Sequence, residues 1–162
     1  MQTQTESNII MTESEIVKRQ DRAEALFREG FNCSQSVVAA CADIYGLDTD
    51  LALRLGASFG GGIGRMRQTC GAACGMFLLA GLQNGSTTPH DNEGKMHNYQ
   101  TVQNLAARFK EENGSIICAE LLGLATPEHS PKPEERTDTY YKKRPCVEMV
   151  RQAVRIYCEN IL

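Results

Sequence analysis

The sequence contains seven cysteines, and four of them lie where a helix is expected to begin. Each of the four closely follows a residue that typically caps or opens a helix: Cys33 after Asn32, Cys70 after Thr69, Cys118 after Ser115, and Cys146 after Pro145. The N-terminal end of a helix carries about half a positive charge and free N–H donors, which favour the thiolate over the thiol. Because the thiolate is the nucleophilic and metal-binding form of cysteine, these positions predict redox or metal chemistry.

The other three cysteines, Cys41, Cys74 and Cys158, are expected well inside helices. A cysteine in such a position is most often a small buried apolar residue. Cys74 differs from the other two, because it lies one helical turn after Cys70 and shares its face. It could replace one of the four helix-start cysteines or serve as a resolving thiol.

The spacing of the cysteines excludes several kinds of site. No two of them form a C-x-x-C pair, which excludes a thioredoxin-type motif, a zinc knuckle, a bacterial ferredoxin motif and covalent attachment of c-type haem. A joint cysteine site must therefore be assembled by the tertiary fold. The three histidines, His90, His97 and His129, have no partner at ligand spacing and are expected on the surface.

Basic residues precede two of the helix-start cysteines. Arg65 and Arg67 come before Cys70, and the run 142–144 comes before Cys146. Positive charge is unfavourable at a helix start, so it predicts a nearby anion such as a thiolate. For the run 142–144 taken alone, a solvated surface position is the preferred explanation.

The glycine-rich run from Gly60 to Gly64 cannot form a stable helix. It could hold an anion on its backbone N–H groups, but it completes neither G-x-G-x-x-G, because Arg67 stands at the third glycine position, nor a P-loop. We therefore expect no nucleotide there, but a close approach of backbone to the cysteine site. Gly71 and Gly75 are likewise expected to allow close packing on the central helix.

Several motifs follow one another in a fixed order along the chain. They are Cys33-Ser34-Gln35, the segment Phe59-Gly60-Gly61-Gly62, the segment Cys70-Gly71-Ala72-Ala73-Cys74-Gly75, Cys118 before Leu121-Leu122-Gly123, and Cys146. In this order the sequence resembles the C_GCAxxG_C_C family of redox-active proteins, over roughly residues 20–160. The central motif reads C-G-A-x-x-G rather than the G-C-A-x-x-G of the family name, and Cys74 falls on a position without an assigned role. The resemblance implies a redox site formed by Cys33, Cys70, Cys118 and Cys146.

The elements that must position these cysteines are helical. Helical periodicity runs through nearly the whole chain, and no strand pattern of useful length is present. The expected helices span residues 12–29, 33–45, a segment starting at Asp48 or Asp50, 70–82, 93–112, a short segment after Ser115, and a last helix from Pro145. The fold class is therefore all-α: a single-domain helical bundle of about seven helices over residues 12–162, with 70–82 as the buried central helix.

Two segments are expected to be poorly ordered. Residues 1–11 form a polar, disordered tail, and residues 125–139 form a long loop that contains three of the five prolines. Because that loop joins the helices of Cys118 and Cys146, it is expected to act as a lid over the site.

Composition places the chain among ordinary globular proteins. It has 162 residues, 41% of them hydrophobic, and a net charge of −3, which argues against nucleic-acid binding. A membrane span needs about twenty apolar residues, and no segment provides them. Residues 1–11 show no export signal. We therefore expect a cytoplasmic protein with reduced cysteines. Apolar stripes on helices 93–112 and 145–161, expected to stay partly uncovered, predict a homodimer.

The leading hypothesis is a cytoplasmic redox protein in which the four helix-start cysteines form one thiolate site. That site would hold a metal centre for electron transfer, with an iron–sulfur cluster preferred and zinc or no cofactor as alternatives. Its partner would be an electron-transfer protein, with no nucleic acid and no membrane. Two other classes stay open: a metal-free thiol–disulfide oxidoreductase, and a helical interaction or dimerisation module with core cysteines. No substrate pocket can be derived, so no enzymatic activity is predicted.

Overall fold

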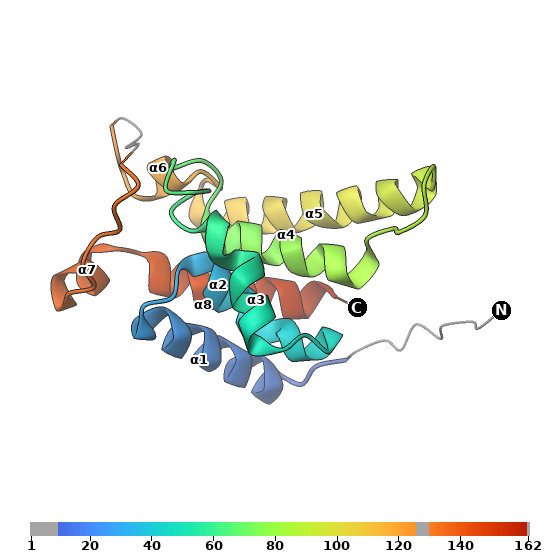
Figure 1. Ribbon diagram of the computed structural model, residues 1–162, viewed down its shortest axis with the longest axis horizontal. Helices are drawn as coiled ribbons and strands as arrows, with labels where there is room; N and C mark the ends of the chain where they lie inside the picture. The colour runs from blue at the N-terminus through green and yellow to red at the C-terminus, as the bar shows by residue number, and fades with distance from the viewer. Residues whose placement is uncertain (1–9, 126–129, 162) are drawn as a thin grey trace.

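A computed structural model describes residues 10–125 and 130–161 (Figure 1). These residues form helices joined by loops and turns, and they contain no strand. The α-helices are α1 (Glu13–Glu29), α2 (Cys33–Cys41), α3 (Thr49–Gly56), α4 (Gly71–Asn84), α5 (Asn92–Asn113), α6 (Cys118–Leu121), α7 (Asp138–Lys143) and α8 (Cys146–Asn160); η1 (Ala42–Tyr45) and η2 (Ala57–Phe59) are 3-10 helices. The all-α prediction is confirmed.

Local capping sets the first helices, as the sequence indicates. Thr12 and Glu15 form a reciprocal capping box at α1, which ends at Gly30 in the left-handed region with φ of 114°. Asn32 and Gln35 form a second capping box at α2. The expected helix 33–45 is divided in two, because the chain tightens into η1 after Cys41.

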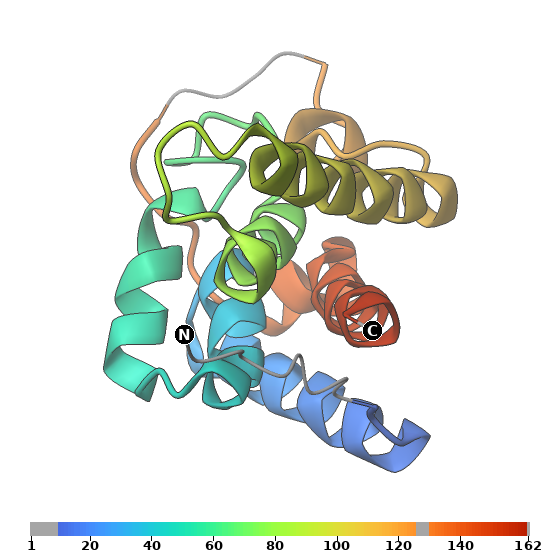
Figure 2. The same cartoon turned by 90° about the vertical axis from the view of Figure 1, so that its right-hand side faces the viewer.

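Helices α2 and α4 lie side by side at the centre of the molecule. α2 packs against α1, α3, α4 and α8, and α4 packs against α2, α5 and α8. Figure 2 shows the outer helices arranged around this pair. α4 is buried along most of its length, as predicted. It shares the centre with α2, whose residues from Ser36 to Cys41 are all buried.

The outer helices α5 and α8 cover this centre. The apolar stripe of α8 is buried at Val150, Val154 and Tyr157 and only partly buried at its two ends, Val147 and Ile161. α5 buries Leu105 and Phe109 in its C-terminal half and exposes Met96 and Tyr99, at 66% and 61%. The homodimer stays a prediction.

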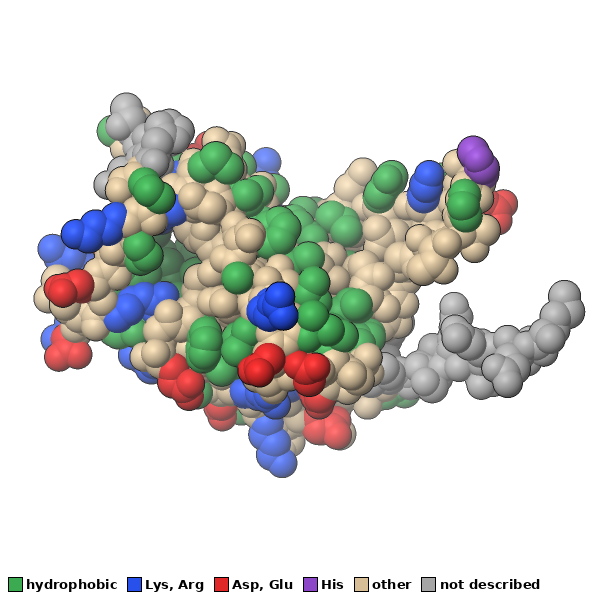
Figure 3. All heavy atoms as spheres, in the orientation of Figure 1, with side chains coloured by type: hydrophobic (Ala, Val, Ile, Leu, Met, Phe, Trp, Pro, Cys, Tyr) green, Lys and Arg blue, Asp and Glu red, His purple; other side chains and the backbone are tan. Residues whose placement is uncertain are grey.

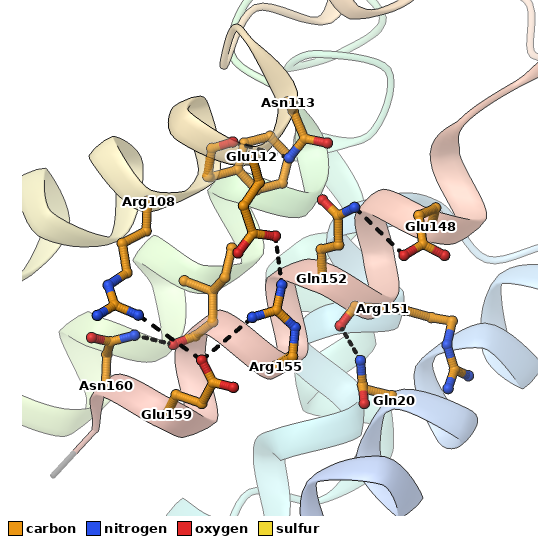
Figure 4. A network of polar contacts seen from close by, with 12 residues as sticks. Gln20, Arg108, Glu112, Asn113, Glu148, Arg151, Gln152, Arg155, Glu159 and Asn160 are labelled. Atoms are coloured by element: carbon orange, nitrogen blue, oxygen red, sulfur yellow. Dashed lines mark hydrogen bonds and ion pairs between the residues drawn. The ribbon is translucent and has the colours of Figure 1, made fainter.

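Ion pairs follow the edge between α5 and α8 (Figure 4). The guanidinium of Arg155 contacts the carboxylates of Glu112 and Glu159, and Arg108 lies 3.9 Å from the Glu159 carboxylate. Exposed pairs of this kind contribute about 0–1 kcal/mol each, so the apolar stripe holds the two helices together. Within the described ranges no helix combines the length and the apolar character needed to cross a bilayer.

Two helix starts and one helix differ from the sequence-based expectation. The N-cap of α4 is Cys70 itself rather than Thr69, and that of α6 is Ile117 rather than Ser115. α7 begins within the expected loop 125–139, because the Thr137 hydroxyl accepts a hydrogen bond from the Tyr140 N–H. Most of the expected tail, residues 1–9, and residues 126–129 of that loop lie outside the described residues.

Replacing Gly75 by alanine tests the contact at the centre. An added Cβ would lie 2.7 Å from the Cβ of Val37, so Gly75→Ala forces α2 and α4 apart. We expect a loss of about 1–3 kcal/mol in the free energy of unfolding, measured by urea denaturation. Gly81→Ala is the matched control on the same helix: its Cβ meets nothing within 4 Å, so it should gain up to about 1 kcal/mol. Equal stabilities of the two variants would contradict the close contact.

Candidate functional site

The four helix-start cysteines line one cavity of about 300 Å³, here called the cysteine cavity. It lies where α2, α4, α6 and α8 begin, beneath the segment that precedes α7, and is seen as a hollow at the left of Figure 3. Its lining includes Cys33, Cys70, Cys118, Cys146, Arg65, Arg67, Glu134, Arg136, Tyr140 and Arg144. Cys41, Cys74 and Cys158 are not part of the lining.

Backbone hydrogen bonds place Cys70 and Cys118 next to each other. Thr69 and Ile117 form an isolated antiparallel bridge just before α4 and α6. The Cys70 N–H donates to the Ile116 carbonyl at 2.7 Å, and the Cys118 N–H donates to the Gln68 carbonyl at 2.6 Å. The two helices therefore start from one shared backbone clamp.

Two glycines bring the backbone close to the cysteines. A Cβ added to Gly71 would lie 3.3 Å from the Cβ of Cys33 and 2.9 Å from the Phe59 carbonyl oxygen. A Cβ added to Gly62 would lie 2.6 Å from the Cβ of Cys118. The glycines thus have the role expected of them, since a side chain at either position would displace a wall of the cavity.

The glycine-rich loop has an unusual handedness. Every residue from Gly61 to Arg65 has a positive φ, and so does Arg67 at 60°. Left-handed backbone costs a non-glycine residue roughly 1–2 kcal/mol, and Ile63 and Arg65 both adopt it. Strain of this kind is typical of functional sites. Here it accompanies the placement of two arginines in the cavity wall.

Arginine side chains line the same cavity as the cysteine sulfur atoms. Nη1 of the buried Arg67 lies 3.7 Å from Sγ of Cys118. Arg65, Arg67 and Arg144 all pair with the carboxylate of Glu134. The basic run 142–144 is thus only partly a solvated surface feature, because Arg144 lines the cavity while Lys142 is exposed.

Arg136 anchors the segment that covers the cavity. Its guanidinium donates to the carbonyl oxygens of Phe27 at 2.8 Å and Phe31 at 3.0 Å, at the end of α1. It also lies 4.3 Å from the ring centroid of Phe27 and 4.9 Å from that of Tyr140. Sequence reasoning missed both Arg136 and Glu134. The only feature of the sequence that could have indicated these two residues was the mixture of prolines and charged residues in the stretch 131–136.

Cys33 and Cys146 form a hydrogen-bonded pair with opposite pKa shifts. The hydrogen bond from Cys33, together with the nearby guanidinium groups of Arg144, Arg136 and Arg67, lowers the pKa of Cys146 despite its burial. The same hydrogen bond, and then burial, raise the pKa of Cys33 well above its ordinary value. Of the two thiols, Cys146 is therefore the one that ionises first.

The other two cavity cysteines are held as neutral thiols. Burial raises the pKa of Cys70 to about 12, against the opposing effect of the backbone groups of Ala73 and Ala72. Burial also raises the pKa of Cys118, with Arg67 acting in the opposite direction. The expectation that a helix start favours the thiolate is thus wrong for Cys33, Cys70 and Cys118. Desolvation or a hydrogen-bonded neighbour outweighs the helix end at each of them.

The three remaining cysteines have other surroundings. Cys41 and Cys158 are fully buried and share a side-chain hydrogen bond between α2 and α8, a neighbourhood that the sequence did not indicate. The Cys74 thiol donates to the Thr69 carbonyl at 3.7 Å. His90 and His97 are exposed as expected, and His129 lies outside the described residues.

The described conformation does not present a metal-binding set. Within the described ranges, no three side chains of His, Cys, Asp or Glu are arranged so that they could share a metal ion. The four cysteines thus share one cavity without converging on one point.

Comparison with known families identifies one family that covers most of the chain. The family model described as "Putative redox-active protein (C_GCAxxG_C_C)" matches residues 31–160. The chain belongs to this family. The C_GCAxxG_C_C match extends from just before Cys33 to the end of α8, so it contains every helix that contributes a cysteine to the cavity. No curated protein and no solved structure matches the chain.

The lowered pKa of Cys146 predicts selective alkylation. Iodoacetamide should modify Cys146 before the other cysteines at neutral pH. Arg144→Gln should slow that reaction severalfold, because loss of the guanidinium raises the pKa of Cys146. Mass spectrometry of protein alkylated over a range of pH measures both effects. Lys142→Gln removes a nearby exposed charge and should leave the rate unchanged. Faster alkylation of Cys70 than of Cys146 would contradict the assignment.

Proposed function

We propose that the protein is a thiol–disulfide redox protein in which Cys33 and Cys146 exchange two electrons with a disulfide substrate. The observation that carries the proposal is the placement of these two thiols in the wall of one open cavity, where each shifts the pKa of the other in the opposite direction. Cys146 is the attacking thiolate, because its pKa is lowered, and Cys33 is the resolving thiol. Redox activity is also the description of the C_GCAxxG_C_C family.

The reaction has two displacement steps. The Cys146 thiolate attacks one sulfur of the substrate disulfide, a mixed disulfide forms, and the first substrate thiolate leaves with the proton of Cys33. The Cys33 thiolate then attacks the sulfur of Cys146. A disulfide between Cys33 and Cys146 forms, and the second substrate thiolate leaves and takes a proton from water. The protein is oxidised by two electrons, and the substrate disulfide is reduced to two thiols.

The surrounding residues favour this sequence. The guanidinium groups of Arg144 and Arg136 stabilise the Cys146 thiolate before the attack. Cys70 and Cys118 stay protonated, so they do not compete as nucleophiles. The hypothesis of core cysteines describes Cys41 and Cys158, which lie in the hydrophobic core and do not line the cavity; Cys70 belongs to both the core and the cavity lining.

Trapping the mixed disulfide tests the proposal. Reduced protein is treated with 2-hydroxyethyl disulfide, and the products are located by mass spectrometry. Cys33→Ser should accumulate an adduct on Cys146, because the resolving thiol is gone. Cys146→Ser should form no adduct on Cys33.

Controls separate the chemistry from the fold. Cys158→Ala should lose about 1 kcal/mol of stability and keep the Cys33–Cys146 disulfide of the oxidised protein. Far-UV circular dichroism should show that the serine variants stay helical. Adducts that persist on Cys146 of the unmodified chain, without closure to a disulfide, would exclude Cys33 as the resolving thiol.

A metal centre is the second candidate, favoured by the placement of four cysteines around one cavity. Thiolates from all four would suit an iron–sulfur cluster or zinc, although the described side chains would have to move to form a ligand set. Both candidates need reduced thiols, in keeping with the cytoplasmic location expected from the sequence. The electron-transfer protein partner also stays a prediction.

Visible absorption and metal content of anaerobically purified protein distinguish the two candidates. A metal centre predicts stoichiometric iron or zinc that is lost in Cys70→Ser as well as in Cys146→Ser. The dithiol proposal predicts protein without stoichiometric metal, in which Cys70→Ser still closes the Cys33–Cys146 disulfide. Cys74→Ser is the control for either case, because its side chain does not line the cavity.

A further inference from the structure

Three guanidinium groups converge on one carboxylate oxygen at the cysteine cavity. Oε1 of Glu134 lies 3.4 Å from Nη2 of Arg65 and 3.9 Å from Nη2 of Arg67, and it also contacts Nη2 of Arg144. Arg65, Arg67 and Arg144 are here called the arginine cluster. Their side chains are only 14%, 6% and 17% exposed, whereas that of Glu134 is 40% exposed. The cations are thus built into the wall, and the carboxylate approaches them from the solvent side.

The arginine cluster lies in the same cavity as the cysteine sulfur atoms and contacts one of them. The guanidinium of Arg67 contacts Sγ of Cys118 through Nη1 and the Glu134 carboxylate through Nη2. Arg144 lines the same cavity as Cys146 and is one of the charges that act on its thiol. A carboxylate held at the position of Glu134 therefore lies in the same cavity as the reacting thiols rather than at a remote surface.

We propose that the disulfide substrate is a small molecule that carries carboxylates, one of which binds the arginine cluster in place of the Glu134 side chain. This inference rests on the proposed function for its chemistry. Guanidinium groups bind carboxylates with good geometry and strength, and nearly buried cations need an anionic partner in every state. A cavity of about 300 Å³ has the size of a site for a small molecule rather than for an extended peptide.

The electron balance is that of the proposed function. The substrate disulfide bond breaks and a Cys33–Cys146 disulfide forms, so two carboxylate-bearing thiols are released for each protein dithiol oxidised. The arginine cluster takes no part in bond formation. It determines which disulfide is held next to Cys146, and Glu134 occupies the anion position when no substrate is bound.

Three disulfides of similar length and different charge test the preference. They are 3,3′-dithiodipropionate, which is anionic, 2-hydroxyethyl disulfide, which is neutral, and cystamine, which is cationic. The reduced protein should form the Cys33–Cys146 disulfide at least about tenfold faster with the anionic compound than with the cationic one at low ionic strength. Added salt should reduce the difference.

Variants assign the preference to particular residues. Arg65→Gln should lower the ratio of the anionic to the neutral rate, and Glu134→Gln should raise it by removing a carboxylate that competes for the same cations. Using the ratio cancels any change in thiol reactivity. Lys142→Gln removes an exposed charge from the same basic run and should leave the ratio unchanged.

Suberate separates this inference from the proposed function. It has the length and the two carboxylates of 3,3′-dithiodipropionate but no sulfur, so its binding, measured by calorimetry, does not depend on thiol chemistry. Binding that weakens in Arg65→Gln and tightens in Glu134→Gln would support the anion site even if no disulfide were reduced. Disulfide exchange with equal rates for the three compounds, and no binding of suberate, would overturn the inference and leave the proposed function intact.

Discussion

The backbone clamp between residues 67–70 and residues 116–119 is the constraint on which the cavity depends. Hydrogen bonds run in both directions across it, from the Cys70 N–H to Ile116 and from the N–H groups of Cys118 and Ala119 to Gln68 and Arg67. Because the clamp lies directly before α4 and α6, it fixes where both helices start. It also closes the left-handed loop, whose last residues pair with α6. A change that opened this clamp would move two cysteines and Arg67 together.

Competition between burial and the helix end decides the chemistry of each thiol. The pKa of Cys70 rises from 9.0 to about 12 on burial, which corresponds to about 4 kcal/mol. A helix N-terminus contributes typically 0.3–1 kcal/mol, so it cannot offset that penalty. Only Cys146 combines a helix start with a hydrogen bond from another thiol and several guanidinium groups. One cavity can therefore hold thiols whose pKa values are shifted in opposite directions.

Local signals in the sequence predicted much of the fold. The capping residues Thr12 and Asn32, the terminating Gly30 and the stripe of α8 act through neighbours within one or two turns, so the sequence displays them directly. The expected helix starts also identified the four cysteines that line the cavity. The role of these cysteines as metal ligands stays a prediction.

The rest depends on contacts between distant segments. Glu134 and Arg136 are ordinary charged residues in a proline-containing stretch until the fold places them against Arg65 and Phe27. The left-handed backbone of Ile63 has no local signal, because its own β-branched side chain disfavours that conformation. The pairing of Cys41 with Cys158 likewise appears only when α8 packs on α2.

The contribution of both α2 and α8 to the cavity has a consequence for how the chain is made. Cys146 is synthesised 113 residues after Cys33 (146 − 33), and translation adds about 5–20 residues each second. The thiol of Cys33 therefore waits on the order of ten seconds for its native neighbour, while Cys41, Cys70 and Cys74 have already emerged. An oxidant present in that interval would join Cys33 to one of these earlier cysteines and prevent α8 from docking. In vitro translation and refolding of this chain therefore require a reductant until α8 has packed.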